Sequence, residues 1–251
     1  MTSVSGATVP QEPVVALAAV TRRLHVAVGA ATRTAEVADA VVAAVLEAVP
    51  GLLGASVTVR RGRRATTAAG SGELPRRADE VQYAAGEGPC LQAIATGAPV
   101  HLEDVVTERR WPAVTPRFAA LGVGSVLSSP LVPADDLEWS AGLNVYAPDP
   151  EGLDPQRRAR TEVVAAVAAG AASAFAHRQR ALNLEEAVAT NREIGAAVGV
   201  LMALRKITKE QAVAELRRVS QHANRKLRDV AAEVLETGQL AEPAPGRAGQ
   251  R

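Results

Sequence analysis

The residues most able to do chemistry in this chain are the arginines and lysines of the segment 204–228. That segment holds eight cations and only two carboxylates, Glu210 and Glu215, in a chain whose net charge is +1. Guanidinium and ammonium groups bind phosphate oxygens, and a polyanion responds to a local surplus of positive charge rather than to the charge of the whole chain. The pattern therefore indicates a phosphate backbone as partner. The alternative is that these cations only form solvent-exposed helix faces, as charge runs commonly do.

Three successive helical patterns hold these cations. The first follows alternating steps of three and four residues, the spacing of a coiled-coil seam, through Leu184, Ala187, Asn191, Ile194, Val198 and Leu201. The second begins at Thr208 and Gln211, whose types and spacing form a capping box. The third begins near Asn224, a favourable N-cap residue, and ends at Gly238. The patterns predict a three-helix bundle whose first helix pairs with a second copy of itself.

The residues of this bundle resemble a known family. The runs NREIGAAVGVLM at 191–202 and ITKEQAVAELRRVSQHANRKLRDVAAEVLETG at 207–238 resemble the ANTAR domain, a three-helix RNA-binding module of bacterial antiterminators. The sequence departs from the family where relatives often carry AKGxLM, because Val198 stands in the place of the lysine. The resemblance implies that a dimer holds two hairpin loops of a nascent transcript and blocks the competing terminator hairpin.

RNA recognition by this bundle must work without aromatic stacking, because the segment 181–238 contains no aromatic residue. Arginine can replace it, since a guanidinium plane stacks on unpaired bases and donates in pairs to phosphate oxygens. Other cations must also replace the missing lysine of the family pattern. The residues that we expect to contact RNA are Arg205, Arg217, Arg218, Ser220, Gln221, Asn224, Arg225 and Lys226.

An α+β pattern precedes the bundle. Helical periodicity covers 14–28, 34–49 and a short stretch at 111–121. Between residues 70 and 100 the pattern indicates a loop and then one helix with Pro89 in its first turn. A helical pattern also runs from 154 towards 204, so a long helix is expected to join the two parts. Strand patterns occur at 55–61, 65–70, 100–103, 125–132 and 137–146.

A second resemblance covers this α+β part. The segments GEGPCLQAIATGAPVHLEDV at 86–105, RWPAVTPRFAALGVGSVLSSPL at 110–131 and GLNVYAPDPEGLD at 142–154 resemble GAF domains, which are small-molecule sensing folds with a central antiparallel sheet. The resemblance implies a small-molecule ligand without identifying it. The expected organisation is a tail at 1–13, a GAF-like sensor domain at 14–172, an ANTAR bundle at 176–238 and a disordered tail at 241–251.

Cys90 is the single cysteine of the chain, which excludes an internal disulfide framework and a multi-cysteine zinc site and favours the cytoplasm. A helix start at Pro89 could lower the pKa of its thiol and make it a ligand-binding or redox group; the simpler interpretation is a small buried hydrophobe.

The four histidines stand singly and no catalytic motif is present, so neither a metal nor an enzymatic activity is predicted. An acidic cluster, Asp135, Asp136 and Glu138, is expected at a solvated hairpin tip.

Neither a targeting segment nor a membrane span is predicted. The N-terminal residues lack a basic region followed by an apolar core. The longest apolar run, 163–176, has fourteen residues, fewer than the about twenty that cross a bilayer.

Two functions from other classes stay open at this point. The basic bundle could be a helix-turn-helix that reads duplex DNA with 224–236 in the major groove. Alternatively, a GAF-like dimer could pass its signal to a protein partner without binding nucleic acid. The motif resemblance favours RNA over DNA, since charge alone does not separate them.

Overall fold

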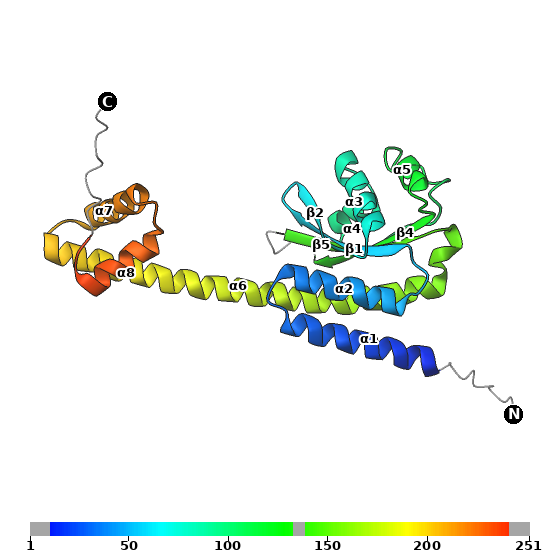
Figure 1. The fold of residues 1–251 in the computed structure, drawn as a ribbon, viewed down its shortest axis with the longest axis horizontal. Coiled ribbons are helices and arrows are strands. Elements are labelled where there is room, and N and C mark those ends of the chain that lie inside the picture. Colours follow the sequence, from blue (N-terminus) through cyan, green and yellow to red (C-terminus); the bar gives the residue numbers. More distant parts are fainter. Residues whose placement is uncertain (1–10, 133–138, 241–251) are drawn as a thin grey trace. The chain divides into compact units, whose positions relative to one another are not determined.

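The structure is a computed structural model that describes residues 11–132 and 139–240. The chain divides into two compact units, one up to His177 and one from Arg178 onward (Figure 1). Helix α6 (Pro155–Arg205) begins in the first unit and ends in the second. The expected acidic hairpin tip of 135–138 and the expected tail of 241–251 lie outside the described residues.

The first unit is built on an antiparallel sheet. Its strands are β1 (Gly54–Arg61), β2 (Arg64–Gly70), β3 (Val100–Leu102), β4 (Ser125–Val132) and β5 (Trp139–Ala147), and the described strands pair in the order β2-β1-β5-β4-β3. All lie where strand patterns were predicted. Side chains alternate between the faces of β1, so that Val57 and Val59 point to one face and Ser56 and Thr58 to the other.

One face of the sheet carries an apolar core under three helices. Helices α1 (Gln11–Ala30), α2 (Thr34–Ala48) and the beginning of α6 cover this face (Figure 1). Val41 and Val45 of α2, Leu143 of β5 and Val164 of α6 are fully buried in it. Because the small residues of α6 pack closely on valines of the sheet, a core almost free of aromatic residues still excludes water.

The other face of the sheet carries a mixed core. Helices α3 (Glu73–Ala85), α4 (Pro89–Thr96) and α5 (Thr115–Ala120) lie over it, and a short 3₁₀ helix η1 (Pro150–Leu153) leads into α6. Phe118 of α5 meets Tyr146 of β5 edge to face, with ring centroids 6.1 Å apart. Between α3 and α4 the chain turns at Gly86, whose φ is +69°.

Three expectations for this unit were wrong in detail. Helix α3 occupies the region predicted as a loop; its apolar residues Leu74, Ala78, Val81 and Ala85 do recur at helical spacing, but the polar residues Asp79 and Gln82 share its buried face and obscure that pattern. The helix expected at 111–121 spans only Thr115–Ala120, with Pro116 rather than Pro112 in its first turn. Residues 11–13, expected in the flexible tail, belong to α1.

The second unit is a three-helix bundle. The end of α6, α7 (Lys209–His222) and α8 (Leu227–Thr237) enclose one apolar cluster. Leu201 of α6, Leu216 of α7 and Val234 of α8 are almost completely buried in it. Helix α8 ends at Gly238, whose φ of +68° confirms the predicted C-cap.

Helix α6 is long and apolar enough, by length and composition, to cross a membrane. Val164, Ala168 and Phe175 of this helix are buried in the core of the first unit, and Ala197, Val198 and Leu201 in the core of the second. Only 17% of the most apolar stretch of this helix is buried.

Candidate functional site

The turn between α7 and α8 holds the basic surface of the second unit in place. The predicted capping box starts α7: the Thr208 hydroxyl accepts from the N–H of Gln211 at 3.3 Å, and the Gln211 side chain accepts from the N–H of Thr208 at 2.9 Å. In the turn, the Ser220 hydroxyl donates to the carbonyl of Arg225 at 2.6 Å. The N–H of Arg225 donates back to the carbonyl of Ser220 at 3.0 Å. This closed loop fixes the backbone at Arg225 and Lys226.

Asn224 is the left-handed residue of this turn rather than the N-cap of the third helix. Its φ is +49°, a left-handed conformation that asparagine tolerates better than most residues. The N-cap of α8 is Lys226. The expectation that helix three begins near Asn224 is therefore corrected, because the chain needs a left-handed residue to reverse direction before α8 can start.

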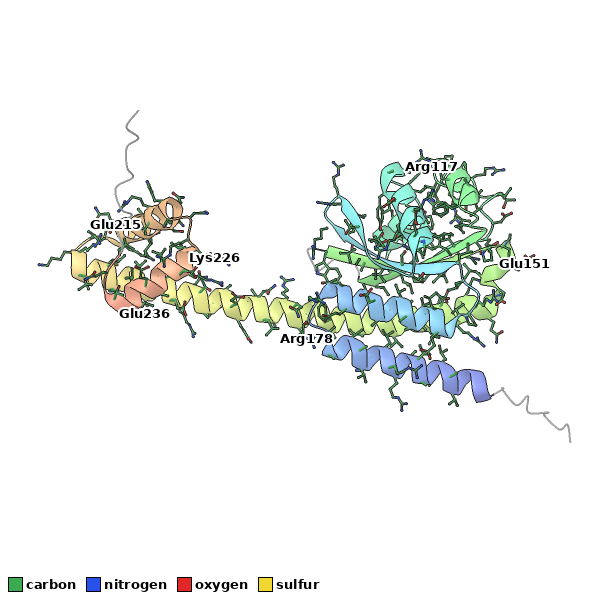
Figure 2. All side chains as sticks on the ribbon, viewed as in Figure 1. Arg117, Glu151, Arg178, Glu215, Lys226 and Glu236 are labelled. Carbon is green, nitrogen blue, oxygen red and sulfur yellow. The ribbon has the colours of Figure 1, made fainter. Side chains whose placement is uncertain are left out.

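The predicted cations divide into two groups. Arg205 pairs with Glu215, and Arg225 pairs with Glu233, each at 2.6 Å. Within the described residues, Arg217, Arg218 and Lys226 form no ion pair. Figure 2 labels Glu215 on α7 and Lys226 before α8. The unpaired cations have all their donors available, whereas the paired ones keep only part of their donors for a phosphate.

The predicted coiled-coil seam is partly corrected by the packing of the bundle. Val198 and Leu201 are 5% and 1% exposed, and with the half-buried Ile194 they pack against α7 and α8. These three residues therefore serve the core of their own chain rather than a second copy. Leu184 and Asn191 of the predicted seam remain exposed.

A stripe of α6 that shares Leu184 and Asn191 with the predicted seam stays exposed. Leu184 and Val188 are 59% and 51% exposed, and Met202 is 37% exposed. Leu184, Val188, Asn191 and Gly195 follow steps of four, three and four, and Met202 lies seven residues further on, past the buried Val198. From Ala181 to Ala189 every residue is exposed. A helix that is exposed on all sides gains no stability from tertiary packing, so an apolar stripe on it is a candidate interface. We call residues 184, 188, 191, 195 and 202 the α6 stripe.

In the first unit, a buried network of polar side chains surrounds Asp79 of α3. Its Oδ1 accepts from the Tyr146 hydroxyl at 2.6 Å, the Ser56 hydroxyl at 2.9 Å and the Asn144 amide at 3.0 Å. Its Oδ2 accepts from the Thr67 hydroxyl at 2.7 Å. Asp79 is fully buried, and burial raises the pKa of its carboxyl even though these hydrogen bonds act in the opposite direction.

Two further residues extend the Asp79 network. The Tyr83 hydroxyl lies 2.8 Å from Thr58 Oγ1 and 3.1 Å from Thr67 Oγ1. The Cys90 thiol, which is completely buried, lies 3.2 Å from Thr58 Oγ1. Burial, reinforced by the nearby carboxyl of Asp79, raises the pKa of Cys90 to about 12. Burial thus disfavours the thiolate of Cys90, which is in keeping with the simpler of the two expectations for this residue.

A cleft opens beside this network. Its volume is about 460 Å³, and its walls come from the β1–β2 turn, the α3–α4 turn and the residue Trp111. The side chains with chemistry in this sensor cleft are Arg60, Arg63, Tyr83, Glu87 and Gln92. The sequence alone assigned none of them, because β1, α3 and α4 bring them together from positions far apart in the chain.

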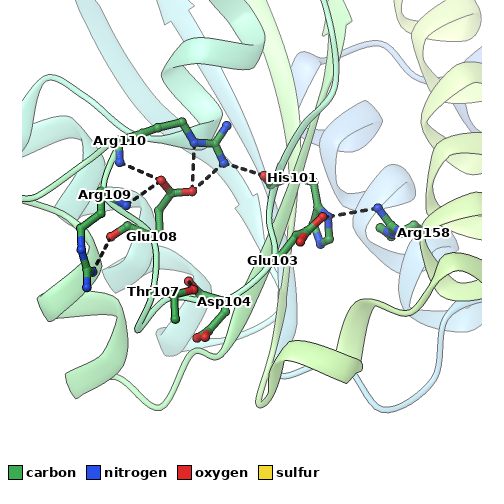
Figure 3. Close-up of polar contacts among 8 residues, drawn as sticks. All are labelled: His101, Glu103, Asp104, Thr107, Glu108, Arg109, Arg110 and Arg158. Atoms are coloured by element: carbon green, nitrogen blue, oxygen red, sulfur yellow. Dashed lines mark hydrogen bonds and ion pairs between the residues drawn. The ribbon is translucent and has the colours of Figure 1, made fainter.

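A second polar cluster ties the segment after β3 to the start of α6 (Figure 3). The Glu108 carboxylate accepts from Arg110 Nε at 2.9 Å and from the N–H groups of Arg109 and Arg110. These bonds, those of the Arg110 side chain first, lower the pKa of Glu108 to about 2. Arg110 also donates to the carbonyl of His101, and His101 Nδ1 lies 3.1 Å from a guanidinium nitrogen of Arg158.

His101 gives this unit a pH dependence. Burial and then Arg158 lower its pKa, against the smaller opposing effect of Glu103. As the pH falls, His101 in the unfolded chain therefore takes up a proton before His101 in the folded chain does. The contribution of His101 to the free energy of unfolding is then lost as the pH falls below about 6.5. We expect the thermal midpoint to fall less steeply in His101→Gln, which keeps an acceptor for Arg158, than in the natural chain between about pH 7.5 and about pH 5. Equal slopes for the two proteins would contradict this role.

Comparisons with known proteins agree with both units. The model of the GAF domain family matches residues 31–176, and the model of the ANTAR domain family matches residues 182–235. A search of the curated proteins found no match to this chain.

Solved structures share the fold of the first unit. A GAF sensor protein from Burkholderia vietnamiensis is 18% identical with a TM-score of 0.51, and covers 66% of this chain and 98% of its own. Free methionine-R-sulfoxide reductase from Neisseria meningitidis, solved in complex with its substrate, is also 18% identical with a TM-score of 0.50, and covers 72% of this chain and 99% of its own. At this identity the likeness establishes the fold alone.

GAF domains are sensor domains, and ANTAR domains are the RNA-binding domains of antitermination regulators. The antiparallel sheet with its cleft and the basic three-helix bundle are the structural counterparts of these two matches. The chain therefore belongs to the GAF domain family and carries an ANTAR domain after its sensor domain.

Proposed function

We propose that this protein is a signal-responsive transcription antiterminator, which binds hairpin loops of nascent transcripts as a homodimer and so prevents termination. The observation that carries the proposal is the ANTAR match over a bundle whose α7–α8 corner presents Arg217, Arg218 and Lys226. Arginine forks suit phosphates and unpaired bases, which accounts for recognition without an aromatic platform.

The α6 stripe supports the homodimer. Leu184 and Val188 are exposed apolar side chains at coiled-coil spacing, and burial against a second copy would remove them from water. Two bundles held together bind two hairpin loops of one transcript with a high effective concentration for the second loop. Dimerisation thereby converts weak binding of one loop into tight binding of a pair.

This stripe yields a prediction with a matched control. We expect Leu184→Glu to weaken the homodimer by about 30-fold or more, because a charge replaces the most exposed apolar side chain of the α6 stripe. Leu182, 52% exposed, lies on a different side of α6, so Leu182→Glu changes charge and length identically and should leave the dimer intact. Sedimentation equilibrium measures both. A dimer equally weakened, or equally unaffected, by both substitutions would place the interface elsewhere.

Helix α6 supports the coupling between signal and RNA. It contributes Val164 and Phe175 to the core of the sensor domain and Ala197 and Leu201 to the core of the bundle. A ligand that changes the packing of the sensor core thus acts on the same helix that carries the dimer stripe. Such coupling requires that the ligand bind the two arrangements of the helix with different affinity.

The proposed role is regulatory and cytoplasmic rather than enzymatic. Both matched families are regulatory domains, and the one cysteine is buried with its pKa raised to about 12. An antiterminator must also reach nascent transcripts, which places it in the cytoplasm. Part of the long helix α6 contributes apolar residues to two domain cores, and its exposed apolar stripe is assigned to the dimer, so the proposal includes no membrane.

The deciding experiment compares three nucleic acids at several salt concentrations: an RNA with two hairpins, an RNA with one hairpin, and a DNA duplex. We expect tight binding to the paired hairpins, weaker binding to one hairpin, and only weak, salt-sensitive binding to the duplex. Preference for the duplex would instead identify a DNA-binding regulator. Absence of salt-dependent binding to all three would identify a GAF-type dimer that signals to a protein partner.

A further inference from the structure

The β1–β2 hairpin carries the most concentrated charge of the sensor domain. Its sequence, Arg60-Arg61-Gly62-Arg63-Arg64, places four guanidinium groups in five residues. Gly62 turns the chain with a φ of +57°, which lets the two strands return at once. The RNA-binding bundle lies in the other unit of the chain, so the proposed recognition of RNA leaves this cluster without a role.

The hairpin divides its four arginines between two surfaces. Arg60 follows Ser56 and Thr58 on the face of β1 that contacts Asp79 and Tyr83, and it lines the sensor cleft together with Arg63. Arg61 and Arg64 pair with each other across the hairpin and do not line the cleft. The pairs therefore have the same charge and nearly the same place in the sequence but differ in access to the cleft.

The two cleft arginines keep their charge uncompensated by neighbours. Arg60 Nε donates to the carbonyl of Gly62 at 2.9 Å, which aims the side chain without neutralising it. Across the described part of the chain, neither Arg60 nor Arg63 forms an ion pair. The one carboxylate of the lining, Glu87, accepts from the N–H of Ala113 at 3.1 Å and thereby joins two walls of the cleft. Two cations against one engaged carboxylate leave the cleft positive.

The uncharged walls of the sensor cleft indicate what the uncharged part of a ligand should be. Leu91 and Ala95 give an apolar surface, and Gln92 adds one neutral polar group. Trp111 is 4% exposed and carries the Arg110 guanidinium over its ring, so it adds little surface of its own. Tyr83 is held by Thr58 and Thr67, so its ring forms a fixed wall between the cleft and the buried network. A volume of about 460 Å³ is the size of a small-molecule site.

We infer that the sensor cleft binds a small organic anion with a flat apolar body, whose acidic group is held by Arg60 and Arg63. Carboxylate, sulfonate and phosphate all fit this description, because a guanidinium fork donates hydrogen bonds to each of them. This inference rests on the proposed sensing role and gives its ligand a chemical class. The binding itself is measurable without RNA.

The test uses two fluorescent dyes that differ in charge. Anilinonaphthalene sulfonate is a flat aromatic anion, and phenylnaphthylamine has the same ring systems without the sulfonate. We expect saturable, single-site binding of the anion to the chain of residues 1–251, at least about tenfold tighter than binding of the neutral dye, since a charge-assisted hydrogen bond adds about that factor. Equal affinity for the two dyes would overturn the assignment of an anion.

The hairpin supplies the matched variants. The double variant Arg60→Gln with Arg63→Gln should weaken binding of the anion by about tenfold or more and leave binding of the neutral dye unchanged. The double variant Arg61→Gln with Arg64→Gln removes the same charge outside the cleft and should bind both dyes like the natural chain. Equal losses of the anion in the two double variants would show a general charge effect and overturn the proposal.

A further variant tests whether the dyes bind in the sensor cleft or elsewhere on the protein surface. Ala95 is an exposed residue of the lining, so Ala95→Trp fills the cleft without disturbing the core. Both dyes should then bind at least about tenfold more weakly, whereas Ala95→Ser should change neither. Undiminished dye binding by Ala95→Trp, with an unchanged thermal midpoint, would place the dye site elsewhere. RNA binding by these variants is a separate measurement, so failure here leaves the antiterminator proposal standing.

Discussion

Replacement of Asp79 by leucine is expected to lower the free energy of unfolding of the sensor domain by about 4 kcal/mol. The carboxylate accepts hydrogen bonds from Tyr146, Ser56, Asn144 and Thr67, and all four donors would lose their acceptor inside the core. Each buried donor left without a partner costs about 1–3 kcal/mol, and rotation of the hydroxyl groups recovers part of the sum. Urea unfolding followed by circular dichroism measures the loss.

Asp79→Asn is the matched control for this prediction. An amide keeps the size of the carboxyl, its oxygen can accept the three bonds made to Oδ1, and its nitrogen can donate to the Thr67 hydroxyl. We therefore expect a loss of only about 1 kcal/mol, the net worth of a single altered hydrogen bond. If leucine proves as mild as asparagine, the Asp79 network contributes little to stability.

The two proteins should also differ in their response to pH. Burial raises the pKa of Asp79 above its ordinary value of 3.8 in the folded state. The folded state thus holds its proton more firmly, and the resulting stability is present below about pH 3.8 and is lost as the pH rises towards the folded pKa. Asp79→Asn has no proton to lose and should lack this component.

Reversal of both Arg217 and Arg218 to glutamate is expected to lower the affinity for the two-hairpin RNA by at least about 100-fold. Both lie on α7 without an ion pair in the part of the chain that the structure describes, so each can meet a phosphate directly. Two attractive contacts become two repulsive ones, and the loss should shrink as salt screens the phosphates. Filter binding at three salt concentrations measures the affinity and the salt slope.

Controls for this prediction separate local contacts from overall charge. The double variant of Arg22 and Arg117 to glutamate makes the same charge change on exposed positions of the sensor domain and should bind RNA with nearly natural affinity. Single Arg217→Ala and Arg218→Ala variants should each lower the salt slope by about one if each arginine contacts one phosphate. Equal losses in both double variants, or unchanged slopes in both alanine variants, would move the RNA surface away from α7.

Much of the fold could be predicted because its signals are local. Strands β1 and β4 lie where apolar and polar residues alternate, and the helix stop at Gly238 follows from its left-handed conformation. The capping box of Thr208 and Gln211 satisfies backbone groups within four residues of each other. Such features depend on neighbours in sequence and need no tertiary partner.

Two of the failures share one cause, which is that a distant residue changes the meaning of a local pattern. Helix α3 was missed because Asp79 and Gln82 face the core, where donors from β1, β2 and β5 make polar groups acceptable. The seam was assigned to Val198 and Leu201 because an apolar stripe fits a second copy as well as it fits α7 and α8. Periodicity shows that a face is covered and leaves open which partner covers it.

The sequence by itself determined the five strands, most of the helices, the capping box at Thr208 and the C-cap at Gly238, the two family resemblances and the local surplus of positive charge. Only the tertiary structure decided which arginines are paired, that Arg60 and Arg63 meet Trp111 in one cleft, and which stripe of α6 stays exposed. The physical reason is range: caps, turns and periodicity act over a few residues, whereas ion pairs, clefts and burial join residues that the chain brings together only by folding.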